Sequence, residues 1–251
     1  GYPQPLHIIS AQLSELGLTL ASKSVDGKSN EIPAVQDLLQ QLDIAGCLVV
    51  ADALNCQKKT AEVIVSGKGD YLLSVKENHP SLLQDIRDYV QDDSLRAAMT
   101  SQTIQEKSRD RIETRTAFVS HNIDWLPQKE QWVHLACIGA IHTQFQTQAG
   151  KSSQWHYYLS SRQLSADELL HHARMEWAVE SMHWMLDVHF EEDYLRVANK
   201  TIQENLNLLR KFSLGLIKQY KSKTGSKRAL SKLMFDCLLD CSMILRILFQ
   251  N

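Results

Sequence analysis

The sequence predicts an α/β fold in which helices flank a mixed sheet, a β-rich insertion interrupts the core and helices follow it. Short apolar runs without alternation, such as residues 46–52, are typical of strands buried on both faces of a parallel sheet. Helical periodicity alternates with these runs through the first 90 residues. Residues 111–161 carry β-like segments alone, which indicates a mainly antiparallel insertion.

The first part of the chain predicts two strands, a helix, a strand, a helix, a strand and a helix. Residues 6–11 and 16–25 are β-prone and form an antiparallel pair. Pro33 suits the first turn of the next helix. Glycines at 67 and 69 separate the following helix from a strand, and Pro80 opens another helix. The helices and later strands are expected at residues 32–42, 46–52, 57–65, 70–76 and 80–90.

The second part predicts strands, then long helices. Residues 92–107 are polar and poorly patterned, which favours an insertion boundary. Ser165 and Glu168 form a capping box at the start of a helix that should run to about Phe190. Strands are expected at 112–119, 132–145 and 155–159, and final helices at 202–220 and 227–248. The expected domains are a core, an insertion, a long helix that completes the core and a C-terminal helical region, at residues 1–92, 93–163, 164–195 and 196–251.

Composition places the chain among ordinary globular proteins, with 251 residues, 43% of them hydrophobic and 22% charged. No apolar run approaches the roughly 18 to 20 residues that span a bilayer, and no signal-peptide pattern opens the chain. We therefore expect a cytoplasmic protein without membrane contact. The five cysteines include no C-x-x-C pair, which argues against a disulfide framework or a zinc site.

Charge is unevenly distributed although the net charge is only −2. Residues 196–232 hold ten Lys or Arg against one acid, Glu204. Such a stretch can neutralise DNA phosphates, or it can be a solvated helix face. The sequence leaves both interpretations open.

Asp52 stands out because it ends a predicted buried strand, where open α/β sheets place functional groups. The alternative is that Asp52 caps the next helix. Asn55 offers an equally good cap, which would leave Asp52 free.

Glu180 is the second candidate, on a helix face that it shares with aromatic residues such as Trp177 and Trp184. The alternative is a solvated Glu on an amphipathic helix. Two carboxylates that converge would suit Mg²⁺, which serves phosphodiester cleavage and transfer. His171 and His172 could also be offered as ligands, but we interpret them as surface residues. No phosphate loop, nucleophile elbow or H-E-x-x-H motif occurs.

Several strings together resemble the H-repeat-associated insertion-sequence transposases, a branch of the DDE superfamily. In family order over almost the whole chain they are residues 6–11, 28–32, Asp52-Ala53 with 56–58, 69–71 with Lys76-x-Asn78, 111–115, 157–161, 177–180 and 183–188.

This resemblance implies an RNase H-like fold in which three acidic residues hold two Mg²⁺ ions, with Mn²⁺ as a substitute. Asp52 matches the family's second catalytic Asp, and Glu180 matches its catalytic Glu, so both are expected as catalytic residues and metal ligands. Lys76, Arg174 and His183 look like phosphate partners.

The implied substrate is double-stranded DNA, both transposon ends and target, handled by a homodimer at the bacterial nucleoid. The basic stretch supplies its own candidate DNA contacts at Arg210, Lys211 and Lys218. The reaction expected is strand cleavage and strand transfer.

The chain departs from the family at its start. The family's first catalytic Asp lies in an Asp-Gly-Lys string on the strand before residue 6, and that strand is absent here. Asp26-Gly27-Lys28 spells the same tripeptide but aligns with another segment. We therefore expect impaired catalysis from this chain alone. A transposase remnant that binds DNA or a protein without chemistry, or a metal-dependent nuclease of the same fold, are the alternatives.

Overall fold

The computed structural model describes residues 7–14, 18–25, 30–107, 111–148, 150–190 and 199–249, and all their side chains except those of residues 7, 178–183 and 200. The chain forms two compact units, each described by itself. One comprises residues 1–34 and 177–251, and the other comprises residues 35–176.

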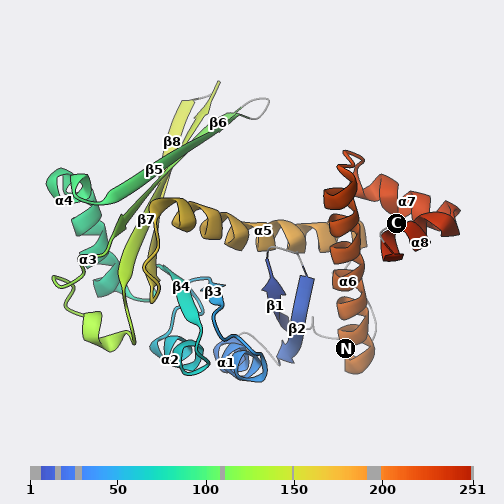
Figure 1. Ribbon diagram of the computed structural model, residues 1–251, viewed down its shortest axis with the longest axis horizontal. Coiled ribbons are helices and arrows are strands. Elements are labelled where there is room, and N and C mark those ends of the chain that lie inside the picture. The colour runs from blue at the N-terminus through green and yellow to red at the C-terminus, as the bar shows by residue number, and fades with distance from the viewer. Residues whose placement is uncertain are drawn as a thin grey trace, which may run out of the picture. The chain divides into compact units, whose positions relative to one another are not determined.

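The unit of residues 35–176 is built on a sheet whose six described strands lie in the order β3-β4-β8-β7-β6-β5 (Figure 1). β3 and β4 are parallel, and every other neighbouring pair is antiparallel. The strands are β3 Leu48–Ala51, β4 Asp70–Val75, β5 Thr100–Lys107, β6 Arg111–Ser120, β7 Cys137–Thr147 and β8 Gly150–Ser160. The predicted α/β class with a mixed sheet flanked by helices is confirmed.

One core joins this sheet to its helices. Leu73, Ile138 and Leu159 from the sheet pack with Ile64 and Ile86, which are fully buried. The helices with side chains in this core are α1 Glu31–Gln41, α2 Lys58–Ser66 and α3 Pro80–Gln91, and α4 Asp93–Ala97 and α5 Ala166–Phe190 follow later in the chain. The order β1 β2 α1 β3 α2 β4 is the one that the RNase H-like prediction requires from its second strand onward.

The long helix α5 begins where the sequence predicted. Ser165 Oγ accepts from the backbone N–H of Glu168 at 3.2 Å, and the Ser165 N–H donates to Glu168 Oε2 at 2.8 Å. This reciprocal capping satisfies two backbone donors. Gly139 in β7 lets the helix approach the sheet, because a Cβ there would lie 2.6 Å from Leu169 Cδ2.

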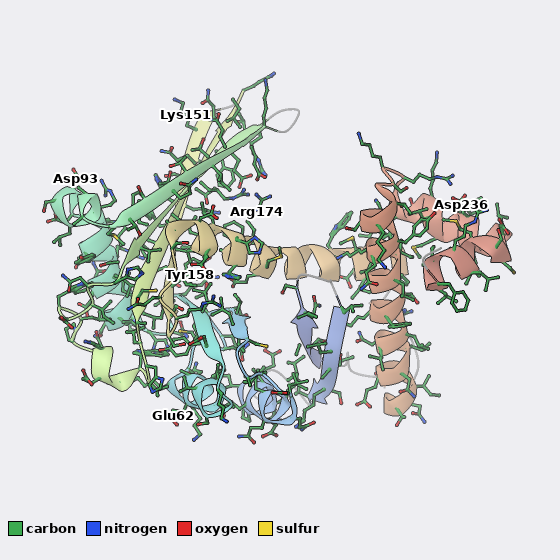
Figure 2. The ribbon with its side chains drawn as sticks, viewed as in Figure 1. Glu62, Asp93, Lys151, Tyr158, Arg174 and Asp236 are labelled. Atoms are coloured by element: carbon green, nitrogen blue, oxygen red, sulfur yellow. The ribbon has the colours of Figure 1, made fainter. Side chains whose placement is uncertain are left out.

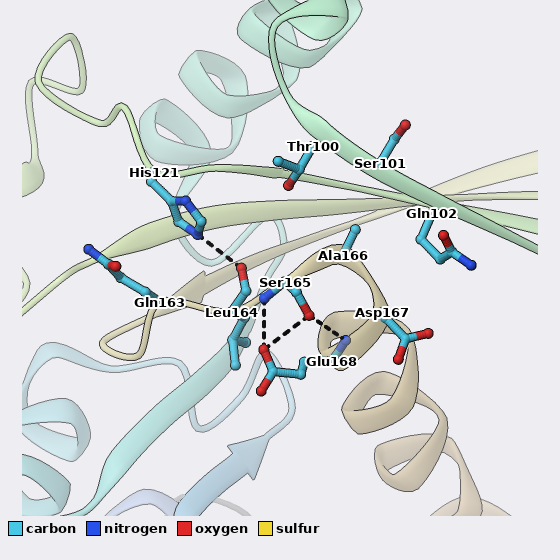
Figure 3. Close-up of a pocket in the computed structure, with 10 residues that line it drawn as sticks. All are labelled: Thr100, Ser101, Gln102, His121, Gln163, Leu164, Ser165, Ala166, Asp167 and Glu168. Atoms are coloured by element: carbon cyan, nitrogen blue, oxygen red, sulfur yellow. Dashed lines mark hydrogen bonds between the residues drawn. The ribbon is translucent and has the colours of Figure 1, made fainter.

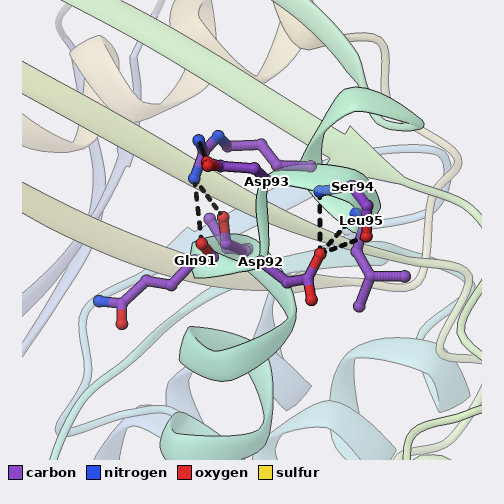
Figure 4. Close-up of polar contacts among 7 residues, drawn as sticks. Gln91, Asp92, Asp93, Ser94 and Leu95 are labelled. Atoms are coloured by element: carbon purple, nitrogen blue, oxygen red, sulfur yellow. Dashed lines mark hydrogen bonds and ion pairs between the residues drawn. The ribbon is translucent and has the colours of Figure 1, made fainter.

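No helix or strand was predicted for residues 92–107, but the segment contains α4 and β5. Asp92 caps α4 by accepting from the backbone N–H groups of Ser94 and Leu95 at 2.9 and 3.0 Å (Figure 4). β5 is a polar edge strand in which Ile104 is the one large apolar side chain, and for that reason alternation did not reveal it.

In the other unit, β1 His7–Leu13 and β2 Leu18–Val25 form the predicted antiparallel pair. The helix α6 Lys200–Thr224 packs against β2. The final predicted helix is instead two, α7 Leu230–Leu239 and α8 Cys241–Phe249. Asp240 separates them because it leaves helical geometry and accepts from the Ser242 N–H at 2.8 Å, which caps α8.

No described helix has the length and apolar character that crossing a bilayer demands. The predicted domain boundaries near residues 92, 163 and 195 stay predictions. In the described residues, the strands of the expected insertion pair antiparallel as predicted and join β4 through β8 in a single sheet.

Candidate active site

Asp52 follows the last residue of β3 and is exposed, while Lys76 follows the last residue of β4 and is also exposed. The two strands are parallel neighbours with Ala51 opposite Leu73. Asp52 and Lys76 therefore lie at the same edge of the sheet, the carboxyl edge where α/β folds place functional groups.

Asp52 does not cap α2. The N-cap of α2 is Gln57, which makes no side-chain capping bond, so the expected Asn55 cap is absent too. Asn55 instead donates to Asp52 Oδ1 twice, from its backbone N–H at 3.2 Å and its side-chain amide at 3.0 Å. The described residues give Oδ2 no hydrogen bond. One carboxylate oxygen is thus oriented by the turn, and the other belongs to an exposed side chain and accepts no hydrogen bond from the described residues.

Two residues after β4 hold this turn in place, and neither had a role that was predicted from the sequence. The Asn78 side chain donates to the carbonyl of Ala53 at 2.6 Å, and a His79 ring nitrogen meets the carbonyl of Cys56 at 2.6 Å. The rings of His79 and Trp132 pack edge to face, with centroids 5.3 Å apart. The Lys76-x-Asn78 string was the available signal, and its Asn is a support for the Asp52 turn.

Cys56, at the end of the turn, belongs to the hydrophobic core. Its side chain is fully buried, and burial, with a smaller contribution from the Asp52 charge, raises the pKa of the thiol to about 12. The thiol therefore stays protonated near neutrality and fills space beneath the turn.

Glu180 and His183 both lie in α5 by their backbone. Their side chains lie outside the described residues, so the convergence of Asp52 with Glu180 stays a prediction. Within the described part of the chain, no group of three His, Cys, Asp or Glu side chains is placed to hold a metal ion.

Arg174 on α5 is half exposed, and Figure 2 labels it on that helix. It pairs with Glu106 of β5 at 2.7 Å, and Glu106 also accepts from Arg115 at 2.6 Å. Hydrogen bonding by Arg115, helped by Arg174, holds the pKa of Glu106 below its usual value. Arg115 pairs with Glu113 as well, and Glu113 in turn pairs with Arg111. The 111–115 string thus forms an ion-pair ladder that ends on α5.

The predicted DNA contacts on α6 differ in their access to solvent. Lys211 is 3% exposed and donates to Ser10 Oγ of β1 at 2.6 Å, so we do not carry it forward as a phosphate contact. Lys218 is half buried, and burial lowers the pKa of its ammonium. Arg210 is partly exposed. The described cations of this region that are exposed lie further along, at Lys223, Lys227, Arg228 and Lys232, and Arg228 is paired with Asp236.

A cavity of about 490 Å³ opens beside the start of α5 (Figure 3). His121, Ser165, Asp167 and Glu168 contribute to its lining, and His121 meets the carbonyl of Leu164 at 2.9 Å. Neither Asp52 nor Lys76 lines it. Its two carboxylates disfavour phosphate, so we assign it no part in the site.

The chemistry of Asp52 suits a hard divalent cation. Mg²⁺ prefers carboxylate oxygens and binds through one or two carboxylates while it keeps water. An exposed, pre-oriented carboxylate at a strand end fits that requirement, and the described residues supply one such group of the predicted pair.

Comparison with known proteins gives one family over most of the chain. Residues 6–216 match the model of the transposase DDE domain. YncI of Escherichia coli O157:H7, whose name provisionally calls it a transposase, is 33% identical over 243 residues, which cover 94% of this chain and 62% of YncI. YhhI of Escherichia coli K12, provisionally named an H-repeat-associated transposase, is 31% identical over 239 residues, 92% of this chain and 63% of YhhI.

The chain thus spans about three fifths of the length of these two curated relatives. Among solved structures, a piggyBac transposase synaptic complex with hairpin DNA is similar at a TM-score of 0.48 and 10% identity, over 96% of this chain and 48% of that one.

Proposed function

Since the chain belongs to the transposase DDE-domain family, we propose that it is the catalytic region of a transposase that cleaves and joins DNA strands with Mg²⁺. The observation that carries this proposal is the Asp52 turn. It presents an exposed carboxylate at the carboxyl edge of the parallel strands, oriented by Asn55 and supported by Asn78 and His79.

Asp52 and Glu180 would hold the metal as ligands, and Mn²⁺ would substitute for Mg²⁺. Bound metal ions of this kind activate an attacking oxygen and stabilise a leaving one in phosphodiester chemistry. Two hydrogen bonds from Asn55 hold one Asp52 oxygen in place, so the carboxylate is oriented before a metal binds. Preorganisation of this kind lowers the cost of assembling a site.

The DNA would meet cations at the edge of the site and along the C-terminal helices. Lys76, Arg174, His183, Arg210 and Lys218 remain the proposed phosphate contacts. Arg174 would have to exchange its Glu106 partner for phosphate. Each phosphate neutralised adds to the salt dependence, which predicts DNA affinity that falls steeply between about 50 and 200 mM salt.

The substrate proposed is double-stranded DNA, as transposon ends and target, bound by two copies of the protein at the bacterial nucleoid. Two proposed carboxylates are fewer than the three that this chemistry takes by resemblance. We therefore propose that the 251-residue chain alone binds metal weakly and is a poor catalyst.

The test is calorimetric Mn²⁺ titration and a strand-transfer assay on a protein extended to the length of the relatives. Asp52→Ala and Glu180→Ala should each abolish metal-dependent cleavage while circular dichroism stays unchanged. Cleavage retained in either variant contradicts the site.

The same assays separate the alternatives. DNA binding that persists in EDTA, with no cleavage in Mn²⁺, would indicate a remnant that binds DNA or a protein partner without chemistry. Cutting without joining would indicate a nuclease.

A further inference from the structure

The ion-pair ladder that joins the insertion strands to α5 alternates in charge along its length. Its members pair in the order Arg111, Glu113, Arg115, Glu106 and Arg174. Glu106 of β5 and Glu113 of β6 are direct partners across the two strands, and Arg174 comes from the helix. The ladder thus joins three cations to two acids, and an arginine stands at each end.

The inner and outer members of the ladder differ in their contact with solvent. The Arg115 and Glu113 side chains are each 12% exposed, whereas Arg174 is 48% exposed. Separation of an inner pair would leave a nearly buried charge without a partner, which is costly. An exposed pair contributes little to stability, so Arg174 can leave its partner at small cost. Arg111, at the other end, is held a second time by the Phe145 ring, whose centroid lies 5.0 Å from the guanidinium carbon.

Glu106 keeps a partner when Arg174 leaves. Its Oε2 atom accepts from Arg115 at 2.6 Å, and its Oε1 atom pairs with Arg174 Nη2 at 2.7 Å, so the two arginines occupy different oxygens. Loss of Arg174 leaves Glu106 bound to Arg115, and water can reach the freed oxygen because the side chain is 43% exposed. The Glu106–Arg174 contact can therefore open without leaving a buried charge unpaired.

We propose that Glu106 is a specificity-determining residue, which competes with DNA phosphate for Arg174. A carboxylate and a phosphate both offer a guanidinium two oxygens for paired hydrogen bonds, so each can replace the other. While Glu106 holds Arg174, a phosphate has to displace the carboxylate. DNA that is already bound at other points presents its phosphate at high effective concentration and can do so, but DNA in a loose encounter cannot.

The inference rests on the proposed function, which places Arg174 among the phosphate contacts, and adds a condition to that contact. Loosely held DNA meets fewer cations, while DNA seated in the site gains one more. Discrimination between the two comes from a built-in competitor as well as from added contacts. Arg174 precedes the proposed catalytic Glu180 in α5, so DNA that gains this contact has reached the helix that carries Glu180.

The experiment is a double-mutant cycle of Glu106→Gln and Arg174→Gln, measured on the whole chain in EDTA as affinity for a fluorescent duplex of arbitrary sequence. Glu106→Gln should bind the duplex about three- to fivefold more tightly than the wild type, the range set by an exposed ion pair. The slope of log affinity against log salt should steepen by about 0.9, because one more phosphate is neutralised. Both replaced side chains are nearly half exposed, so the fold should tolerate the changes.

Arg174→Gln separates release of the arginine from a simple loss of negative charge. In the Glu106→Gln background, it should cancel the gain in affinity and in salt slope. In the wild-type background the loss should be smaller, because Glu106 already withholds the arginine from loosely bound DNA. This difference between backgrounds is a readout that a purely structural ladder would not give.

The matched control is Glu113→Gln, which removes the same charge from the residue opposite Glu106 but leaves the Glu106–Arg174 pair intact. Its effect on DNA affinity should multiply with that of Arg174→Gln, without coupling. Glu130→Gln, which replaces an exposed acid outside the ladder, is a second control that leaves the nearly buried members undisturbed.

Independent effects of Glu106→Gln and Arg174→Gln, or an unchanged salt slope in Glu106→Gln, overturn the proposal and make the ladder a purely structural tie. The proposed function stands in that case, because its metal and cleavage tests do not involve Glu106. If no variant binds DNA, the DNA contacts of the proposed function fail together with this proposal.

Discussion

Gly139→Ala tests how closely α5 packs on the sheet. The new Cβ would lie 2.6 Å from Leu169 Cδ2 and 3.4 Å from Cδ1, and Leu169 is 1% exposed, so its methyl groups have little room to move. Overpacking of this kind costs about 1 to 3 kcal/mol. The roughly 0.5 to 1 kcal/mol that alanine gains over glycine in a strand offsets part of that cost. We expect a net destabilisation of about 1 to 2 kcal/mol.

The decisive version is a double-mutant cycle with Leu169→Ala. Alone, Leu169→Ala should cost about 2 to 5 kcal/mol, because it leaves a cavity over the strand. In the double variant, the methyl group at 139 enters the space that the leucine vacated. The combined cost should therefore fall short of the sum by about 1 to 2 kcal/mol.

Urea unfolding followed by tryptophan fluorescence measures each corner of the cycle. The control pair is Leu169→Ala with Gly67→Ala, whose new Cβ would instead meet Ile44, and this pair should be additive within about 0.5 kcal/mol. Additive costs at 139 and 169 would refute the close approach of helix and strand.

Three further outcomes follow from single side chains. Iodoacetamide at pH 8 should label the exposed Cys241 and leave Cys56 unlabelled until the protein unfolds, which mass spectrometry of the digest measures. The Cys56 thiol is buried, and with a pKa of about 12 only about one part in ten thousand of it is thiolate at that pH. The pKa of Glu106 is lower in the folded protein than in the unfolded chain, where it is about 4.3. The ionised carboxylate therefore stabilises the fold fully above a pH of about 4.3, and this contribution is lost as the pH falls through the folded-state pKa. Glu106→Gln should accordingly weaken the dependence of the unfolding free energy on pH in the acid range. The effect should be only a few tenths of a kcal/mol, because the carboxylate is 43% exposed, and an unchanged profile would contradict the ladder. Asn78→Ala should cost about 1 kcal/mol in urea unfolding and speed amide exchange at residues 53–57, whereas Glu77→Ala, an exposed neighbour, should do neither.

Much of the fold followed from local pattern. The non-alternating run that ends at Asp52 identified a strand parallel to its neighbour, but its expected burial on both faces was wrong, because β3 lies at the edge of the sheet and is only partly buried. The Ser165–Glu168 spacing located the start of α5. Periodicity could not reveal β5, because its side chains are nearly all polar and so show no alternation of apolar and polar residues. It also could not locate the break at Asp240, because apolar spacing continues across it and only the capping hydrogen bond ends the helix.

The site was predictable in part for a related reason. A carboxylate at a strand end is visible in sequence, and Asp52 indeed lies at the edge of the sheet. The supports were not visible, because Asn78 reaches a carbonyl 25 residues earlier in the chain and that contact exists only after β3 and β4 pair. The burial of Lys211 on α6 could not be predicted either, because its contact with Ser10 of β1 joins residues that are far apart in the sequence.

β3 has a practical consequence for anyone who handles this protein. Among the described residues it pairs with β4 alone, so its other edge carries backbone groups without a strand partner. The strand Leu-Val-Val-Ala carries no lysine, proline or bulge, but it is only four residues long, and a very short edge strand is itself one of the devices that natural sheets use against edge-to-edge aggregation. The length of β3 should therefore limit strand addition between purified chains, and an insertion that lengthens this apolar edge should make them aggregate as concentration and temperature rise.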